Sequence, residues 1–152
     1  MYLAVALCVT AIYAAPVPLV GTWRLNSQEV NGQKTTNAEP LTLRITQSGD
    51  KLNFAFSVPV NNVYFVSMSY AVKLDGSEAD VKNANGEKIG TVQIMPAGPS
   101  QYKITLKGPN RPDSSGKLIV SADGKTLTSE QDTAPGGPSA RSIHSRQLFS
   151  RY

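Results

Sequence analysis

The chain offers few residues of the types that perform acid–base, nucleophilic or metal chemistry. It has a single histidine, His144, so neither a multi-histidine metal site nor a second imidazole proton relay can be built. Ser142 and Ser145 lie near it in sequence, but catalytic triads depend on the geometry of distant residues. The acidic residues between positions 75 and 80 lack the spacing of a calcium loop. We therefore expect a protein that is not an enzyme and that holds no metal or cofactor.

One short segment resembles a nucleotide-binding motif. Residues 123–126 read Asp-Gly-Lys-Thr, which matches the end of a phosphate-binding loop. The rest of the motif is missing, because its first glycine would fall on Ile119 and no helix follows. The segment predicts a tight turn between two strands instead.

Large apolar side chains recur at alternate positions and could line a pocket. Small-molecule sites combine apolar walls with a few polar groups, and phenol hydroxyls can orient a ligand there. The alternative is that the same rings fill the core, which the scarcity of Gly and Ala at inward positions favours. The candidate residues for a ligand site in the interior are Phe54, Phe56, Tyr64, Met68, Tyr70 and Tyr102.

The strand that organises these residues is predicted at positions 19–25. Its apolar positions Leu19, Trp23 and Leu25 alternate with a mixed file, and Gly21 lies between them. Trp23 is the only tryptophan, so it brings the largest apolar side chain to the core. A glycine two residues before it lets another backbone or ring come close.

The rest of the chain predicts an all-β protein. Apolar and polar residues alternate with a period of two, turn dipeptides such as Asn-Gly and Asp-Gly separate the runs, and no segment has helical periodicity. Short connections pair neighbouring strands, so we expect an antiparallel up-and-down meander of eight to nine strands. Closure into a barrel would bury the apolar face and remove exposed edges. Eight regular strands are predicted at 19–25, 41–46, 52–58, 63–74, 102–107, 118–122, 126–131 and 141–148, and the less regular patterns at 78–82 and 88–95 account for the upper number.

The amino terminus predicts export. Residues 3–15 carry no charge, and small residues precede Pro16, as in a secretory signal peptide without its basic region. The run is too short to cross a bilayer, so we expect no transmembrane segment in the mature protein. We expect residues 1–15 to be a signal peptide and residues 16–152 to form a single domain. Cys8, the only cysteine, would leave with the signal, and a secreted or periplasmic location follows.

Charge gives no indication of a nucleic-acid partner. The formal net charge is +4, but the basic residues are scattered singly along the predicted strands. Such scattering is typical of the solvent-exposed faces of a sheet and of edge strands whose charges prevent further pairing. No basic cluster interleaved with aromatic residues is present in the sequence.

The run Gly21-Thr22-Trp23 resembles the G-x-W motif of lipocalins and the wider calycin group. The longer run Gly-Thr-Trp-Arg-Leu-Asn at 21–26, with Asp-Gly-Lys-Thr-Leu-Thr at 123–128, is similar to small secreted bacterial proteins with lipocalin-like barrels. In lipocalins an arginine from the last strand stacks on this tryptophan at the closed end of the barrel. The resemblance implies that Trp23 pairs with Arg146, or failing that with Arg141. Lipocalin cysteines and a carboxy-terminal helix are missing.

Together these patterns predict an exported, lipocalin-like barrel that holds a small apolar or amphipathic molecule and catalyses no reaction. The alternative is a solid barrel that acts outside the cytoplasm as a protein-interaction or structural domain, through its loops. An open cavity beside the tyrosines would favour the first function. A filled interior with an apolar surface patch would favour the second.

Overall fold

Eleven β-strands joined by short connections make up the computed structural model, which describes residues 17–35, 41–109, 111–135 and 141–152. The predicted signal segment, residues 1–15, lies outside the described residues. No helix among them is long and apolar enough to span a membrane. The strands are β1 (Gly21–Val30), β2 (Gln33–Thr35), β3 (Thr42–Ser48), β4 (Lys51–Val60), β5 (Val63–Lys73), β6 (Ala79–Asn83), β7 (Lys88–Gly98), β8 (Gln101–Gly108), β9 (Arg111–Val120), β10 (Thr126–Thr133) and β11 (Ile143–Arg151).

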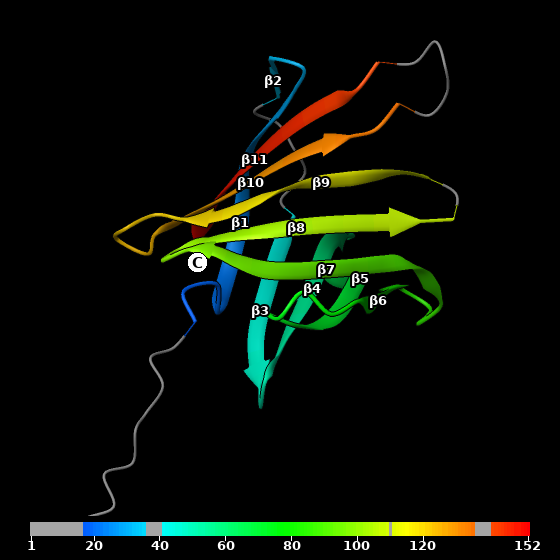
Figure 1. Ribbon diagram of the computed structural model, residues 1–152. Helices are drawn as coiled ribbons and strands as arrows, with labels where there is room; N and C mark the ends of the chain where they lie inside the picture. Colours follow the sequence, from blue (N-terminus) through cyan, green and yellow to red (C-terminus); the bar gives the residue numbers. More distant parts are fainter. Residues whose placement is uncertain (1–16, 36–40, 110, 136–140) are drawn as a thin grey trace, which may run out of the picture.

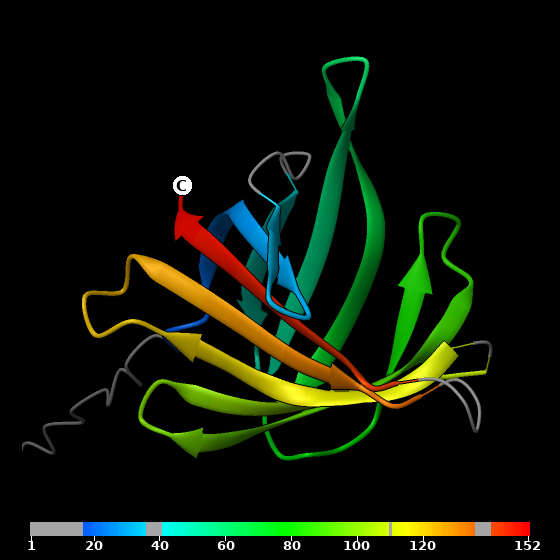
Figure 2. The same cartoon turned by 90° about the horizontal axis from the view of Figure 1, so that it is seen from above.

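The strands form one antiparallel sheet that closes on itself (Figures 1 and 2). Sequential strands from β3 to β11 are neighbours, β1 pairs with β3, and β11 returns to pair with β1. Ten strands therefore make a closed meander barrel, while β2 is an extra strand that pairs only with the upper part of β1. The predicted all-β antiparallel barrel is confirmed, but the predicted number of eight to nine strands was too low.

Two polar segments account for longer strands than expected. β9 begins at Arg111 although its first residues are rich in proline and serine, and its Ser114 and Ser115 pair with both β8 and β10. Gly116 permits this pairing, because a Cβ there would lie only 1.8 Å from the carbonyl oxygen of Glu130. β11 continues to Arg151 instead of ending at position 148 as predicted, because it pairs with the Trp23 end of β1.

The buried core fills the end of the barrel where the chain enters β1 and leaves β11. Its largest fully buried side chains are those of Trp23, Phe54 and Phe149. Leu19, just before β1, is also fully buried, as the alternation at positions 19–25 predicted. The buried apolar side chains form one cluster, and its burial stabilises the barrel.

The β4–β5 hairpin extends beyond its neighbours and stands out in Figure 2. Its tip, Asn61-Asn62, has positive φ at both residues, as a type I′ turn requires. A β-bulge interrupts the pairing: Phe56 faces Met68, but the next residue, Ser57, faces Val66. Above this bulge the alternation of β5 is shifted by one residue, so the side chains exchange faces.

Candidate ligand-binding cavity

The closed end of the barrel is locked by a tryptophan and an arginine. The Arg151 guanidinium lies over the Trp23 ring, 4.4 Å from its centroid, and the two residues face each other across β1 and β11. The same guanidinium donates hydrogen bonds to the carbonyl oxygens of Gly124, Val20 and Pro18 at 2.7, 3.0 and 3.1 Å. The Trp23 indole N–H donates to Leu19 at 2.9 Å. The lock ties the segment before β1 to the β9–β10 turn and the last strand.

The prediction that Arg146 stacks on Trp23 was wrong, and Arg141 does not take that place either. Arg146 points away from the barrel interior and pairs with Glu130 at 3.5 Å. Its position in β11 has the opposite parity to Phe149 and Arg151, which point inward.

Gly21 makes room for the arginine. A Cβ at this position would lie 2.6 Å from Arg151 Nη1, and three carbonyl oxygens hold the guanidinium group in place. Its φ of 154° is also unusual for a residue with a side chain. The glycine of the Gly-x-Trp pattern is therefore explained here by the space that the stacked guanidinium occupies.

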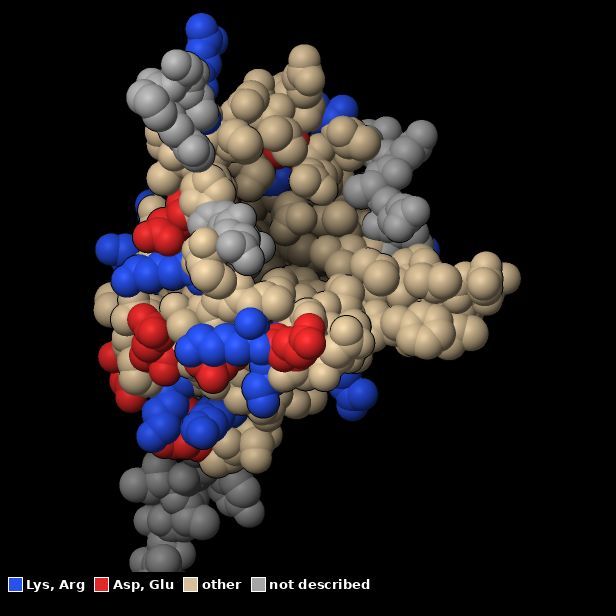
Figure 3. Space-filling view, turned by 90° about the vertical axis from the view of Figure 1, so that its right-hand side faces the viewer, with Lys and Arg blue, Asp and Glu red and all other residues tan. Residues whose placement is uncertain are grey.

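A cavity of about 310 Å³ occupies the other half of the barrel interior. It is hollow in Figure 3, which looks onto the end of the barrel opposite the lock. No charged side chain is among the residues that line it, so the site suits a neutral molecule or an uncharged portion of one. Its lining residues are Leu41, Leu43, Phe54, Phe56, Ser67, Met68, Tyr70, Ile104, Leu106, Leu118, Leu127, Ser129, Gln131, Gln147 and Phe149.

The cavity has an apolar side and a polar side. Phe54 and Tyr70 stack with ring centroids 4.7 Å apart and form part of the apolar wall with Phe56. Ser129, Gln131 and Gln147 supply hydroxyl and amide groups from β10 and β11.

The hydrogen bonds that the Gln131 side chain makes are long. It donates to Ser129 at 3.4 Å and accepts from Ser114 at 3.4 Å. Bonds of this length are near the limit for a hydrogen bond, so a ligand can replace them at little cost. The polar wall therefore keeps donors and acceptors that a bound molecule can use.

Four of the six predicted pocket residues line this cavity: Phe54, Phe56, Met68 and Tyr70. Tyr102 is buried in the interior, with 5% of its surface exposed, but it is not among the lining residues. Burial raises the pKa of its phenol.

The placement of Tyr64 inside the barrel was wrong. Its side chain is 52% exposed and borders a groove on the outer face, beside Arg24 and Arg44. The bulge at Phe56 and Ser57 is the cause, because it shifts the alternation between Tyr64 and Met68.

Tyr70 provides a further polar group at the cavity. Its side chain is only 6% exposed, and burial raises the pKa of its phenol far above the ordinary value of 10.0. No hydrogen bond of its hydroxyl is found among the described residues. Since no fully buried polar side-chain atom of these residues lacks a partner, this hydroxyl is not fully enclosed by protein. The hydroxyl therefore borders open space, where it can donate to a ligand.

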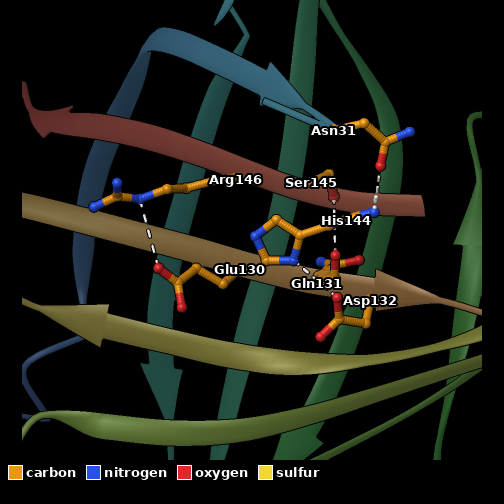
Figure 4. A network of polar contacts seen from close by, with 7 residues as sticks. All are labelled: Asn31, Glu130, Gln131, Asp132, His144, Ser145 and Arg146. Atoms are coloured by element: carbon orange, nitrogen blue, oxygen red, sulfur yellow. Dashed lines mark hydrogen bonds and ion pairs between the residues drawn. The ribbon is translucent and has the colours of Figure 1, made fainter. Parts of the chain in front are cut away.

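The sequence did not predict the pairing of His144, which lies on the outer face of the barrel (Figure 4). Its Nδ1 is 2.8 Å from a carboxylate oxygen of Asp132 on β10, and its backbone N–H donates to the Asn31 side chain at 3.0 Å. A serine nucleophile would have to lie on the free side of the imidazole, but Ser115 faces Asp132 across the sheet instead. Ser145, which follows His144 in sequence, donates its hydroxyl to the carbonyl oxygen of Gln131 at 3.5 Å (Figure 4).

Other hollows on the surface differ in character from the interior cavity. One of these hollows, of about 600 Å³, lies along β4, β5 and β6 and is lined in part by charged residues such as Lys51, Lys73 and Asp80. Lys73 and Asp80 are already paired, with Asp50 at 2.7 Å and Lys88 at 2.6 Å. Within the described ranges, no group of three or more possible metal ligands is found. The interior cavity is therefore the best-formed candidate site for a small molecule.

In comparisons with known proteins, no family model matches the chain and no curated protein matches it. The closed antiparallel barrel is compatible with a lipocalin-like fold.

Proposed function

We propose that this barrel is an exported, lipocalin-like carrier that binds a small, uncharged or amphipathic molecule in its interior and catalyses no reaction. The observation that carries the proposal is the 310 Å³ cavity, with aromatic and aliphatic residues on one side and serine and glutamine side chains on the other. Its volume lies at the lower end of the range for small-molecule sites, and its composition matches their pattern of apolar walls and few polar groups. A ligand would place its apolar part against Phe54 and Tyr70 and its polar group near Gln131 and Gln147.

Native mass spectrometry of the protein, purified from the culture medium of cells that secrete it, tests the proposal directly. We expect a retained small molecule as an additional mass that is lost on collisional activation. In parallel, the neutral probe N-phenyl-1-naphthylamine should gain fluorescence on titration, because binding moves it from water to the apolar wall of the cavity.

A pair of variants on one strand locates the binding site. Ser129→Phe places a ring inside the cavity and should abolish the probe signal, whereas Thr128→Phe places the same ring on the outer face. Thermal unfolding should show that both variants remain folded. Equal probe binding in the two variants would refute the interior site, and so would a wild-type protein that binds neither ligand nor probe.

Export is a part of the proposal that depends on the sequence alone. The uncharged run at residues 3–15 and the small residues before Pro16 support it. Amino-terminal sequencing of the protein recovered outside the cytoplasm should give a chain that begins near position 16. An intact Met1 on the recovered protein would contradict it.

The alternative, a domain that acts through its surface, has a separate observation in its favour. Apolar side chains are exposed along the upper β4–β5 hairpin, as an interaction module requires. The two functions are compatible, because the hairpin side chains are exposed outside the cavity.

A further inference from the structure

The upper β4–β5 hairpin is an apolar ribbon that projects from the barrel. Between Leu52 and Val72 the sequence has no charged residue, although 17% of the whole chain is charged. Figure 2 shows the hairpin extending past its neighbours, and in Figure 3 it projects without charge while acidic and basic side chains gather on the other side. The exposed fractions are 50% for Val60, 55% for Val63, 52% for Tyr64, 53% for Phe65 and 45% for Val66.

One edge of this ribbon is open. β5 pairs with β4 from its first residue, but it pairs with β6 only at Met68, Ser69 and Tyr70. The backbone of residues 63–67 therefore has no neighbouring strand on that side among the described residues. Val60 and Val63 flank the type I′ turn and form its hydrogen-bonded pair, so alternation directs the N–H and C=O groups of Tyr64 and Val66 to the open edge.

These features favour a protein strand over lipid as the occupant. Unpaired backbone groups of a sheet edge are not tolerated in the hydrocarbon of a bilayer. The tip of the hairpin is Asn61-Asn62, whose amides would enter the membrane first. An added β-strand, in contrast, pairs the backbone groups and covers the apolar side chains at the same time.

We propose that the strand is the same segment of a second copy of this chain, so that residues 63–67 of two copies pair antiparallel about a twofold axis at Phe65. In this register Tyr64 of each copy exchanges backbone hydrogen bonds with Val66 of the other, and the two Phe65 residues lie opposite each other. Self-pairing brings residues 63–67 of the two copies opposite each other, and it is permitted here because the segment has no charge that would repel the second copy.

The exposed area fits a reversible dimer. The five half-exposed side chains offer roughly 400–500 Å² per copy, so two copies bury at most roughly 800–1,000 Å². Interfaces of this size are small and transient, so we expect a reversible dimer with a dissociation constant in the micromolar range or weaker. The proposal is independent of whether the barrel holds a ligand.

Light scattering coupled to size-exclusion chromatography of the full chain, across the micromolar range, tests the pairing. We expect a concentration-dependent shift from one to two copies. Val66→Lys places a charge on the open edge and should raise the dissociation constant at least about tenfold. Ser115→Lys is the matched control, since this exposed residue lies on a strand paired on both sides, and it should leave the constant unchanged.

A second pair of variants tests the register. In a chain with Cys8→Ser, Phe65→Cys should form a covalent dimer under mild oxidation, because directly opposed residues have Cα atoms about 4.5 Å apart, within the range for a disulfide. Ser115→Cys should form no covalent dimer under the same treatment, because Ser115 lies on a strand that is paired on both sides. Circular dichroism and buried Trp23 emission confirm that each variant is folded.

A chain that stays monomeric at all concentrations overturns the proposal. So does a dimer that Val66→Lys leaves intact, or one in which Phe65→Cys forms no disulfide. A monomer that binds vesicles of zwitterionic lipid through the hairpin, with Val66→Lys abolishing the binding, would overturn it in favour of a membrane surface.

Discussion

Replacing Arg151 by methionine tests the lock at the closed end of the barrel. Methionine keeps much of the apolar stem and removes the guanidinium that stacks on Trp23 at 4.4 Å. A cation–π contact contributes about 0.5–2 kcal/mol. The three hydrogen bonds to backbone carbonyl oxygens add about 1 kcal/mol each at most, and less here because the arginine is exposed to water.

We therefore expect Arg151→Met to lower the free energy of unfolding by about 2–4 kcal/mol. For a domain of this size the melting temperature should fall by about 6–15 °C. The assay is urea unfolding followed by the emission of Trp23, which is the only tryptophan and is fully buried. Loss of the lock should shift the native emission to longer wavelength, because water gains access to the indole.

Arg146→Met is the matched control for the same assay. It removes an exposed ion pair with Glu130, which contributes about 1 kcal/mol or less. The sequence resemblance gave Arg146 the stacking role, so the two variants separate the two assignments. Equal destabilisation by both variants, or a larger effect of Arg146→Met, would refute the lock described here.

The remaining predictions concern single positions. Gly21→Ala should lower the free energy of unfolding strongly, because its Cβ would lie 2.6 Å from Arg151 Nη1. The same change should lower the free energy of unfolding less in an Arg151→Met background. Additive effects in a double-mutant cycle would show that the two residues do not interact. Tyr70 has a raised pKa in the native state, so it contributes stability below the ordinary tyrosine pKa of about 10, and this stability is lost as pH rises through the raised value. A spectrophotometric titration at 295 nm should show one tyrosine that ionises only with unfolding, and Tyr70→Phe should remove that signal. Ionisation of Tyr70 in the folded protein near pH 10 would contradict its burial. His144→Ala should lower the free energy of unfolding by less than about 1 kcal/mol in urea, since the Asp132 pair is exposed, and a loss of several kcal/mol would show that the pair is structurally essential.

Alternation along the chain predicted most of the strands, because a buried face imposes a period of two on any sequence that forms a half-buried sheet. It predicted the interior positions of Phe54 and Tyr70 in the same way. The rule failed at Tyr64, because a bulge adds one residue to β5 and no residue type in the segment marks its position. Local patterns alone could not correct this error.

The inward positions of Arg151 and of the polar cavity wall were missed for a different reason. In this case the alternation along β10 and β11 did contain the signal. Phe149 points inward, and the same parity assigns Arg151 and Gln147 to the interior and Arg146 to the surface. On β10 the parity of Leu127 likewise places Ser129 inward. The prediction missed the stacking arginine because it ended the last strand at position 148. It missed the polar wall of the cavity because it treated polar residues as outward-facing. What the sequence cannot supply is the register of β1 against β11, which joins residues more than a hundred positions apart.

The number of strands explains why this interior is partly hollow although its inward side chains are large. In an eight-stranded barrel such side chains fill the interior, and this comparison favoured a solid core. The diameter grows with the number of strands, and ten strands close this barrel. At the locked end Trp23 and Phe149 fill the greater width. At the other end the inward positions of β10 and β11 become serine and glutamine, too small or too polar to pack against the opposite wall, so a cavity of about 310 Å³ remains between them and the aromatic residues of β4 and β5.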